Sequence, residues 1–525
     1  MADGSVDEIA RRRHLHEIDY VDFREGRTES SIAGSATNSV VLESGSHETT
    51  SSTDSADDRL SKRSICGVRV SFLNIILMGF GFMLNIGVYN SAGMAQTVVL
   101  NTVNDTYMVG YPTLGFNLFA VICGTQAFAY LFGPAVVAIT GPKLGMVLGS
   151  VSVTFYLASF IRPIIWVLYI SAGCAGFGVG IIWTVQGYFV TINSTAKRVL
   201  RNTGVFWGLY MSTLVTGNLF YFFMVRAYPA KGHKPYSQAD LDILDYRRML
   251  IFSILTAASA LGVLVFSLVV HPWVGKIPRP RDDILTGTTP HNDVALQQQT
   301  FRGPKEAFLA TVKFMFRKDM VILMPMFFYI GIEGCFWGSV YITALGYTDR
   351  FGERQEEMVG LAGVFAGGGE IAGGLILGLL GKWMHFNGKD SALMFGMILH
   401  IVACYLTFLN TPAESALAET KDWPYIGEPN PYLAMFVSFI FGLGDALWNN
   451  QLMAYLGEVY RHECVSVFAV YQFWCALAAA LAFVSASFLT LPWQLLGVIA
   501  VSIPSAAGFC YVEWKSLRNH PLVPI

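Results

Sequence analysis

The sequence contains a series of uninterrupted apolar runs, each about 20 residues long, separated by short polar stretches. A helix of about 20 apolar residues crosses the roughly 30 Å hydrocarbon core of a bilayer. Only 14% of the residues are charged, against about 25% in a typical soluble domain, which is too few to cover a water-facing surface. The pattern predicts a multi-span helical membrane protein. It argues against a soluble enzyme, a nucleic-acid-binding protein and a disulfide-stapled secreted domain.

The apolar runs form two groups of six with a long polar connection between them. The predicted spans are 70–92, 112–134, 144–161, 164–190, 204–226 and 248–270 in the first group, and 320–345, 358–380, 391–410, 432–455, 466–489 and 491–512 in the second. We expect a disordered Ser/Thr-rich tail (1–66), an N-terminal six-helix bundle (67–270), a linker (271–319), a C-terminal six-helix bundle (320–513) and a C-terminal tail (514–525). The first tail is too polar to bury a core.

Lys and Arg concentrate in the N-terminal tail, the linker and the loops on the same side of the membrane. Cytoplasmic loops carry this excess, so both termini are predicted to be cytoplasmic, in the plasma membrane or an endomembrane. Asn104 then falls in the first external loop. It belongs to an Asn-Asp-Thr sequence, the acceptor pattern for N-glycosylation, which makes this protein a predicted glycoprotein.

An internal repeat relates the two groups of spans. The fourth span contains Gly178-Val-Gly180 followed by Trp183 and Gln186, and the tenth contains Gly442-Leu-Gly444 followed by Trp448 and Gln451. The same order recurs about 264 residues later. Two parallel six-helix repeats of this kind are the arrangement of the major facilitator fold. The predicted fold class is therefore all-α integral membrane, with twelve transmembrane helices in two six-helix bundles.

Polar side chains near the centres of the spans mark a candidate site. Buried ionisable groups are costly in a bilayer, so they usually face a bundle interior or a cavity. The candidate residues are three carboxylates (Glu333, Glu370 and Asp445), six amides (Asn85, Asn90, Gln126, Gln186, Asn218 and Asn449) and Trp183. Spans three, six and twelve have no comparable group. Because these helices face lipid in a major facilitator, the distribution supports that fold.

Two interpretations of the carboxylates stay open. Burial would let them carry protons near neutral pH and contact a substrate. Alternatively, neighbouring helices satisfy each acid and the acids stabilise packing. Glu370 favours the second interpretation more than the others, because it lies among small residues that let helices approach closely. No basic residue occupies the centre of a span, so a site lined by these acids favours a cation or protonated acids.

Nothing in the sequence indicates a cofactor or a catalytic centre. The eight cysteines lie in or beside apolar spans, without the close Cys/His spacing of a metal site. No nucleophile elbow or phosphate-binding loop is present. We therefore expect no enzymatic activity and no metal or cofactor.

Several segments together resemble the uncoordinated-ninety-three-like family of atypical major facilitators. They are the fourth span from Gly176 to Tyr188, Asn202 to Trp207, Gly217-Asn218-Leu219, Gly442-Leu-Gly444-Asp445, Gln451-Leu452 and Trp493-Gln494-Leu495-Leu496. The resemblance covers about residues 68–514 and implies a twelve-helix membrane protein. Family members are described as solute transporters, as a regulatory partner of a potassium channel, and as an escort of innate immune receptors.

One departure from transporting facilitators bears on the choice between these functions. The loop from Gly133 to Gly145, between the second and third spans, has no acid and a single base, Lys143. Transporting facilitators carry an Asp/Arg-rich gate motif there. The sequence therefore leaves two hypotheses: a secondary transporter of an unknown small molecule or ion, possessing a midplane cavity and coupled to protons, or a non-transporting regulator or escort of another membrane protein.

Overall fold

The computed structural model describes residues 64–65, 68–107, 113–194, 198–228, 237–269, 304–352, 355–387, 389–460 and 463–519. They belong to one compact unit. Their only strands are the two-residue pair β1 (Ser64–Ile65) and β2 (Val68–Arg69), which run antiparallel. Apart from β1, the predicted disordered tail 1–66 lies outside the described residues. Most of the linker 271–319 and the end of the tail 514–525 also lie outside them.

The first half of the chain forms six long helical segments. They are α3 (Val70–Phe82), a π-helical turn η1 (Met83–Gly87) and α4 (Val88–Tyr107) in one continuous rod, then α5 (Leu114–Ser159), α6 (Ile165–Ile192), α7 (Val199–Arg226) and α8 (Gln238–Leu268). A short helix, α9 (Pro304–Met315), precedes the second half. It lies inside the predicted linker 271–319.

The second half repeats this plan. Its first rod comprises α10 (Lys318–Cys335), the π-helical turn η2 (Phe336–Val340) and α11 (Tyr341–Gly346). The remaining helices are α12 (Gln355–Asn387), α13 (Asp390–Asn410), α14 (Pro431–Val459), α15 (Cys464–Ala486) and α16 (Leu491–Asn519), with the 3₁₀ turns η3 (Asp349–Phe351) and η4 (Ala413–Ala416) between them.

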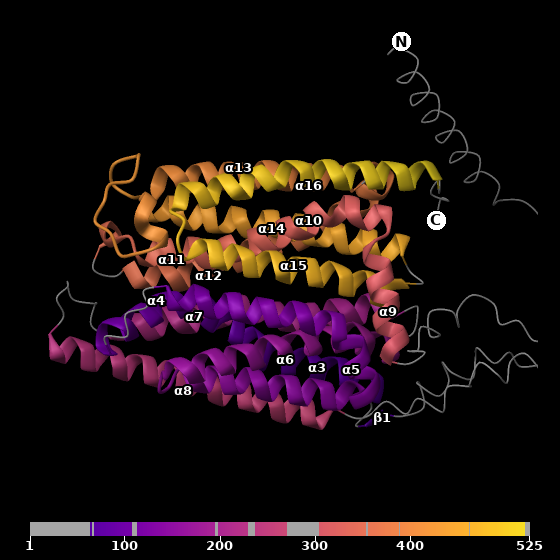
Figure 1. Ribbon diagram of the computed structural model, residues 1–525, viewed down its shortest axis with the longest axis horizontal. Helices are drawn as coiled ribbons and strands as arrows, with labels where there is room; N and C mark the ends of the chain where they lie inside the picture. The colour runs from indigo at the N-terminus through magenta and orange to yellow at the C-terminus, as the bar shows by residue number, and fades with distance from the viewer. Residues whose placement is uncertain are drawn as a thin grey trace, which may run out of the picture. The chain divides into compact units, whose positions relative to one another are not determined.

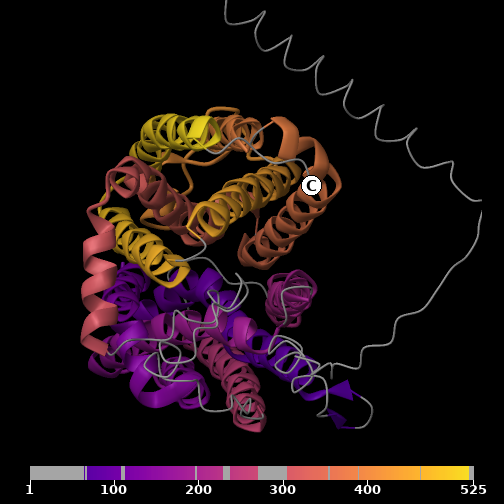
Figure 2. The ribbon, with the colours of Figure 1, turned by 90° about the vertical axis from the view of Figure 1, so that its right-hand side faces the viewer.

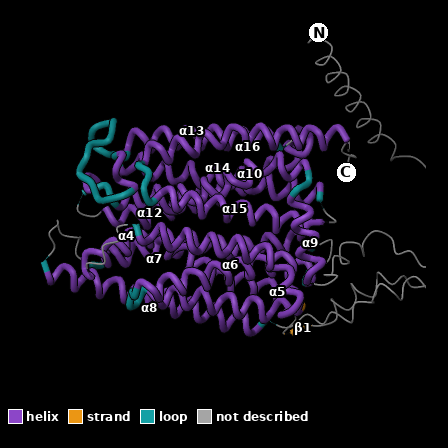
Figure 3. Tube along the Cα trace, in the orientation of Figure 1, coloured by secondary structure: helices purple, strands orange, loops and turns teal. Residues whose placement is uncertain are grey.

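The helices pack as two layers, one from each half of the chain (Figure 1). Helices α3 to α8 form one layer and α10 to α16 form the other, as the view along the helices also shows (Figure 2). The layers are joined mainly by two helix pairs, α5 with α15 and α7 with α12, while α4 also contacts α11 and α12, and α9 contacts both α5 and α15 at one end. We call this the α9 end. The opposite end, which holds η3, η4 and the loop that follows η4 (Figure 3), is called the η4 end.

Local sequence signals explain several helix boundaries. Ser237 and Asp240 form a reciprocal capping box that starts α8 about ten residues before the predicted apolar span. At the start of α14, the Asn430 side chain accepts hydrogen bonds from two backbone N–H groups, and Pro431 occupies the first helical position. Such caps satisfy donors that the first turn leaves without a partner.

Among the described residues, eleven helical segments are long and apolar enough to cross a membrane. The sequence predicted twelve. The difference falls in α5, where the candidate span ends at Val137 and the segment after Gly141, predicted as the span 144–161, is not among the eleven. Gly141 breaks the helix with φ 76° and ψ 165°, a conformation that favours glycine.

Candidate functional site

The three predicted carboxylates converge in the second half of the chain, although they come from three helices. Glu333 lies at the end of α10, Glu370 in the middle of α12 and Asp445 in the middle of α14. The Asp445 side chain lies within hydrogen-bonding reach of both Glu333 and Glu370. We call these three residues the acid cluster. Because an ionised carboxylate only accepts hydrogen bonds, two carboxyl groups can bond to each other only when one holds a proton.

Close helix contacts bring the acid cluster together. A Cβ atom at Gly442 of α14 would collide with the backbone oxygen of Ala366 on α12, and one at Gly369 would collide with the backbone oxygen of Phe439. Only glycine allows this approach. The small residues around Glu370, which favoured a packing role for it, thus place Glu370 beside Asp445.

His400 of α13 is the basic group beside the acid cluster. Its Nδ1 lies 2.6 Å from the hydroxyl of Tyr329. Its Nε2 lies 3.2 Å from Oε1 of Glu333 and 3.3 Å from the backbone oxygen of Phe441. A neutral imidazole with its proton on Nε2 fits these neighbours, since the hydroxyl then donates to Nδ1 and the Phe441 oxygen accepts from Nε2–H. Oε1 of Glu333 lies near the same nitrogen without forming a hydrogen bond. Protonation of His400 would place a positive charge against Glu333.

Glu333 is the most deeply buried member of the acid cluster. The residue is 1% exposed. Neither carboxylate oxygen accepts a hydrogen bond from a donor group among the described residues. A buried carboxylate without donors is strongly disfavoured relative to its protonated form or to a cation-bound form. Glu333 is therefore suited to exchange a proton or a cation.

Asp445 also connects to a chain of polar side chains. The Asn449 side chain donates to Oδ1 of Asp445 at 2.7 Å, and the Tyr471 hydroxyl donates to Oδ1 of Asn449 at 3.1 Å. Asn449 was predicted as a site residue, and the structure brings it into contact with the acid cluster. Tyr471 comes from α15, so a fourth helix contributes to this network.

Aromatic side chains of the first half lie beside the acid cluster. Tyr210 of α7 lies close enough to Glu370 for the two side chains to interact electrostatically. The predicted site residue Asn90 donates to the Tyr210 hydroxyl at 2.8 Å. Around Tyr210 are four further rings, and we call the five residues the aromatic cluster: Phe82, Trp183, Phe206, Trp207 and Tyr210.

The other predicted amides take separate positions. Gln126 donates to the Tyr130 hydroxyl at 2.8 Å, and Gln186 is half-buried on α6. Asn218 is buried and packs against Gly363 of α12, so it contributes to the contact between the halves.

Asn85 lies in the interior of the first bundle, away from the acid cluster. Its amide nitrogen contacts Ser150, Thr154 and Ser259, which belong to α5 and α8. The side chain of Asn104 is outside the described residues, although its backbone belongs to α4.

The contacts between helices define how the two halves correspond. Three close contacts in the first half each have a counterpart in the second. Between α6 and α5, Gly176 contacts Ile122 and Gly180 contacts Ala129; between α14 and α12, Gly442 contacts Ala366 and Ala446 contacts Gly373. Likewise Gly149 contacts Ile182 in the first half, and Gly396 contacts Trp448 in the second. In each case the α6 and α14 residues differ by 266 and their α5 and α12 or α13 partners by 244 or 247. The predicted offset of about 264 was therefore wrong by two residues. Because glycine recurs at 176, 178 and 180, the sequence comparison paired Gly442 with Gly178 instead of Gly176.

This correspondence shows that the acid cluster has no equivalent in the first half. The position of Glu370 corresponds to Gln126, Asp445 to Val179, and Asn449 to Trp183. Trp448 corresponds to Ile182 rather than to Trp183, and it is fully buried against Tyr329. The two halves thus share a backbone plan but carry different chemistry.

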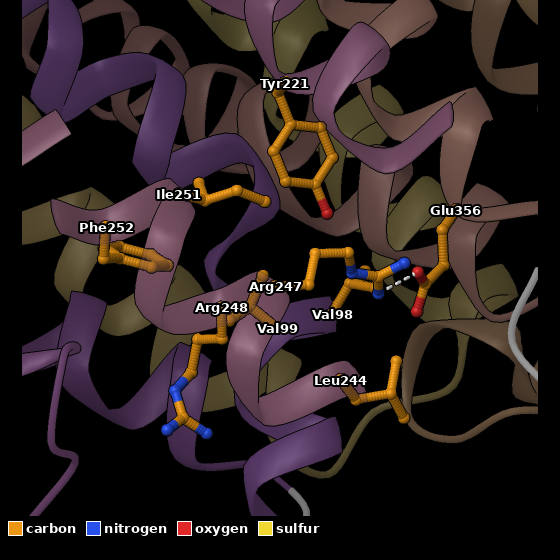
Figure 4. Close-up of a pocket in the computed structure, with 9 residues that line it drawn as sticks. All are labelled: Val98, Val99, Tyr221, Leu244, Arg247, Arg248, Ile251, Phe252 and Glu356. Carbon is orange, nitrogen blue, oxygen red and sulfur yellow. Dashed lines mark hydrogen bonds and ion pairs between the residues drawn. The ribbon is translucent and has the colours of Figure 1, made fainter. Parts of the chain in front are cut away.

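Polar contacts tie the halves together at the η4 end. The Arg247 guanidinium of α8 forms a buried ion pair with Glu356, in the first turn of α12 (Figure 4). Three hydrogen bonds also cross between the halves there, from Tyr347 to the Thr97 backbone, from Asn101 to Glu419 and from Ser487 to Asn117. These contacts close the η4 end.

At the α9 end, exposed ion pairs connect helices of the second half. Arg317 binds Glu463 through two hydrogen bonds of 2.9 and 2.7 Å, and Lys515 binds Asp319 at 2.7 Å. Burial, together with Asp319, raises the pKa of the neighbouring Tyr460 hydroxyl to about 12. Exposed pairs of this kind contribute little stability.

No group of three or more His, Cys, Asp or Glu side chains arranged to hold a metal ion occurs within the described ranges. The carboxyl groups of the acid cluster lie instead where they can share protons through Asp445.

Comparison with known proteins places the chain among its relatives. The family model "Ion channel regulatory protein UNC-93" matches residues 111–512. The chain belongs to the UNC-93 family. It is 30% identical to the UNC93-like protein MFSD11 of Xenopus tropicalis over 450 residues, which cover 85% of this chain and 97% of that protein. Protein unc-93 homolog A of Bos taurus is 24% identical over 85% of this chain and 94% of its own length. The predicted family resemblance is confirmed.

Solved structures similar to this UNC-93 family chain are transporters. A POT family transporter in complex with 5-aminolevulinic acid matches with a TM-score of 0.59 and 12% identity, over 87% of this chain and 99% of that one. The major facilitator superfamily transporter FucP, in the outward conformation, matches with a TM-score of 0.52 and 12% identity, over 84% and 99%. At these identities the similarity establishes the fold, and the predicted major facilitator fold is confirmed.

Sequence reasoning did not single out four residues that the structure brings to the site or to the contact between the halves. His400 and Tyr329 are single residues in apolar spans, and no pattern separates them from packing residues. Arg247 and Glu356 lie near the ends of two predicted spans, where charged residues are ordinary. The available signal was that Arg247 and Glu356, of opposite charge, are both predicted at the same side of the membrane, where they could form an ion pair.

Proposed function

We propose that this protein is a proton-coupled secondary transporter whose solute site lies between its two halves, beside the acid cluster. The observation that carries the proposal is the burial of Glu333 without a donor, next to Asp445 and Glu370. Polar groups of the first half, Asn90 and Tyr210, lie across from this cluster. Intramembrane acids of this kind mark ion and substrate pathways.

The mechanism follows from the two ends of the molecule. With the η4 end closed by Arg247–Glu356 and the neighbouring hydrogen bonds, solute reaches the site from the α9 end. Opening the η4 end requires these contacts to break as the halves rock about the site. A proton on the acid cluster lowers the cost of exposing it to the low-dielectric interior during this change.

Proteoliposomes provide the test. Purified protein is reconstituted with a pH-sensitive dye inside, a broad solute panel is added, and solute-dependent proton movement is recorded. We expect Glu333→Gln and Asp445→Asn to abolish this movement, because neither amide can release a proton. Glu463→Gln is the control, since Glu463 is an exposed acid at the α9 end. Unchanged coupled movement in both cluster variants, with melting temperatures like the parent, contradicts the proposal.

A second candidate function is that of a regulator or escort of another membrane protein. The matching family model is described as an ion channel regulatory protein, and the break at Gly141 lies in a segment with the single base Lys143 and no acid. This function predicts that a partner co-purifies stoichiometrically in mild detergent. It also predicts that Glu333→Gln leaves the partner bound. Absence of any partner from native membranes counts against it.

The placement in the membrane is part of the same proposal. We infer that both termini are cytoplasmic and that Asn104 carries an N-linked glycan on the opposite side. Epitope tags at either terminus are then reached by antibody only after cells are permeabilised. Asn104→Gln is expected to remove the mobility shift that glycosidase treatment produces.

A further inference from the structure

The site lacks any permanent positive charge of its own. The sequence contains no Lys or Arg in the stretches 70–142, 163–196, 202–225, 319–349, 355–381, 422–460 and 462–514. These stretches include the central parts of the helices that carry the acid cluster and the aromatic cluster. Any positive charge that balances an ionised acid there has to be a proton or part of a ligand.

The groups around the acid cluster agree with this charge balance. Its titratable neighbours on α7, α10, α13 and α15 are Tyr210, Tyr329, His400, Cys404, Tyr471 and Cys475. His400 is the one group among them that can become positive. Its Nδ1 lies against the Tyr329 hydroxyl, and its Nε2 lies 3.3 Å from the Phe441 backbone oxygen and 3.2 Å from Oε1 of Glu333. While His400 is neutral, the positive charge that balances an ionised Glu333 has to come from outside.

The aromatic cluster supplies a second and independent feature. Trp183 and Trp207 stack at 5.7 Å between ring centroids, and Tyr210 lies 5.4 Å from Trp183 and 5.7 Å from Trp207. Trp183 and Trp207 are half-buried, unlike the fully buried Phe82 and Phe206. Ring faces attract cations, tryptophan most strongly. Tyr210, a member of this cluster, hydrogen-bonds to Asn90 and lies within electrostatic range of Glu370, so the ring cluster and the carboxylates are neighbours across the two halves.

We propose that the site takes an organic cation, held between the carboxylates of the acid cluster and the rings of the aromatic cluster, and that the cation and the proton compete for the same carboxyls. The proposal rests on the proposed transport function and specifies its substrate class. Competition for one site also fixes the direction of coupling, because the protein then exchanges a cation for a proton.

The charge balance of one cycle is simple. A cation enters the protonated site, one carboxyl O–H bond breaks, and the proton leaves to water. When the cation departs on the other side, a proton from that side re-forms the O–H bond. The net charge of the site is the same with either occupant, so neither state leaves an unbalanced charge in the membrane.

The test uses two ions of the same shape and opposite charge. Tetraphenylphosphonium and tetraphenylborate are added separately to purified protein in nanodiscs, and equilibrium binding is measured at pH 6 and pH 8. Choline and benzyltrimethylammonium extend the test to smaller cations. Proton release on binding is followed with an indicator dye in weak buffer. We expect at least one of the cations to bind, more tightly at pH 8, releasing about one proton per cation at a pH where the acid cluster is protonated, while tetraphenylborate does not bind.

Matched variants assign the binding to the site. Glu333→Gln and Asp445→Asn are expected to abolish proton release. Trp207→Leu is expected to weaken cation binding by about 3- to 30-fold, whereas Trp207→Phe keeps a ring face and most of the affinity. Melting temperatures of all four variants check folding. If the acid variants do not fold, the Trp207 pair still decides the aromatic contribution.

The outcomes separate this inference from the proposed function. Binding of neutral or anionic solutes with proton coupling, but of no cation, overturns the inference and leaves the transport function standing. Cation binding that is equal in the parent and the variants overturns the inference too, because it then reflects the lipid. No binding or coupled movement for any solute overturns both.

Discussion

The two halves of the molecule share a backbone and differ at the positions that matter chemically. At corresponding places on α5 and α12 stand Gln126 and Glu370, and on α6 and α14 stand Val179 and Asp445. The second half thus carries groups that gain and lose protons, while the first half presents amides and rings. The duplicated backbone therefore determines where helices cross, and a few side-chain differences give the two halves different chemical roles.

The two seams between the halves differ in the same way. Where α5 meets α15, Phe119 and Phe483 stack at 4.7 Å. At the corresponding place between α7 and α12, Asn218 meets Gly363, and the Arg247–Glu356 pair lies toward the η4 end of that side. The ring contact makes the α5–α15 seam mainly apolar, with the Ser487–Asn117 hydrogen bond near its end, and we call it the apolar seam. The α7–α12 seam is the polar one. The polar seam therefore includes contacts that depend on charge.

The greatest loss of stability is expected when the polar seam is broken. Arg247→Met leaves Glu356 buried without its ion-pair partner, which costs about 3–5 kcal/mol of stability. Thermal unfolding in detergent measures the loss. The double variant Arg247→Met/Glu356→Met is the control and is expected to recover much of it, since both charges of the buried pair are then removed together. A single variant as stable as the parent would show that the pair does not hold the seam.

The next prediction tests whether the two halves share one packing plan. Gly176→Val and Gly442→Val each add a side chain where a backbone oxygen of the neighbouring helix lies. Both are expected to cost about 1–3 kcal/mol by overpacking, and by similar amounts. Gly374→Val is the control, because a Cβ there meets no atom within 4 Å. Clearly unequal losses at 176 and 442 would contradict the correspondence.

A third prediction makes the halves alike at one position. Glu370→Gln gives the second half the amide that Gln126 provides in the first. Because Asp445 then loses an acidic partner, we expect cation affinity at pH 8 to fall about tenfold. This corresponds to about 1.4 kcal/mol, near the lower end of the contribution of a hydrogen bond to a charged group. The pH dependence of binding is expected to weaken as well. Gln126→Asn, a neutral change in the other half, serves as the control, and equal losses in both would erase the distinction.

A more modest change is expected at the apolar seam. Phe483→Leu removes a stacked ring and is expected to cost about 1 kcal/mol, less than the loss at the polar seam. Thermal unfolding again provides the measurement. Phe488→Leu, at an exposed ring outside α15, is the reference. A loss larger than that of Arg247→Met would reverse the ranking of the two seams.

The sequence predicted the fold well because span length and hydrophobicity depend on local composition. It placed most spans within a few residues of the observed helices, and it identified the three members of the acid cluster. It could not show which polar residues meet. Asn85 and Asn90 lie in the same rod, yet the first faces α5 and α8 while the second reaches Tyr210. Asn85 lies within the π-helical turn η1 and Asn90 just after it in α4, and this change of helical phase is invisible to hydropathy.

The π-helical turns η1 and η2 bear on how the two halves arose by duplication. A π-turn accommodates one residue more than an α-turn, so it typically marks a single-residue insertion in an older helix. Here η1 begins at Met83 and η2 at Phe336, so the first rod of each half contains one such turn. A turn of this kind in the first rod of each half is what a single insertion made before the duplication of a half-length gene would leave in both copies.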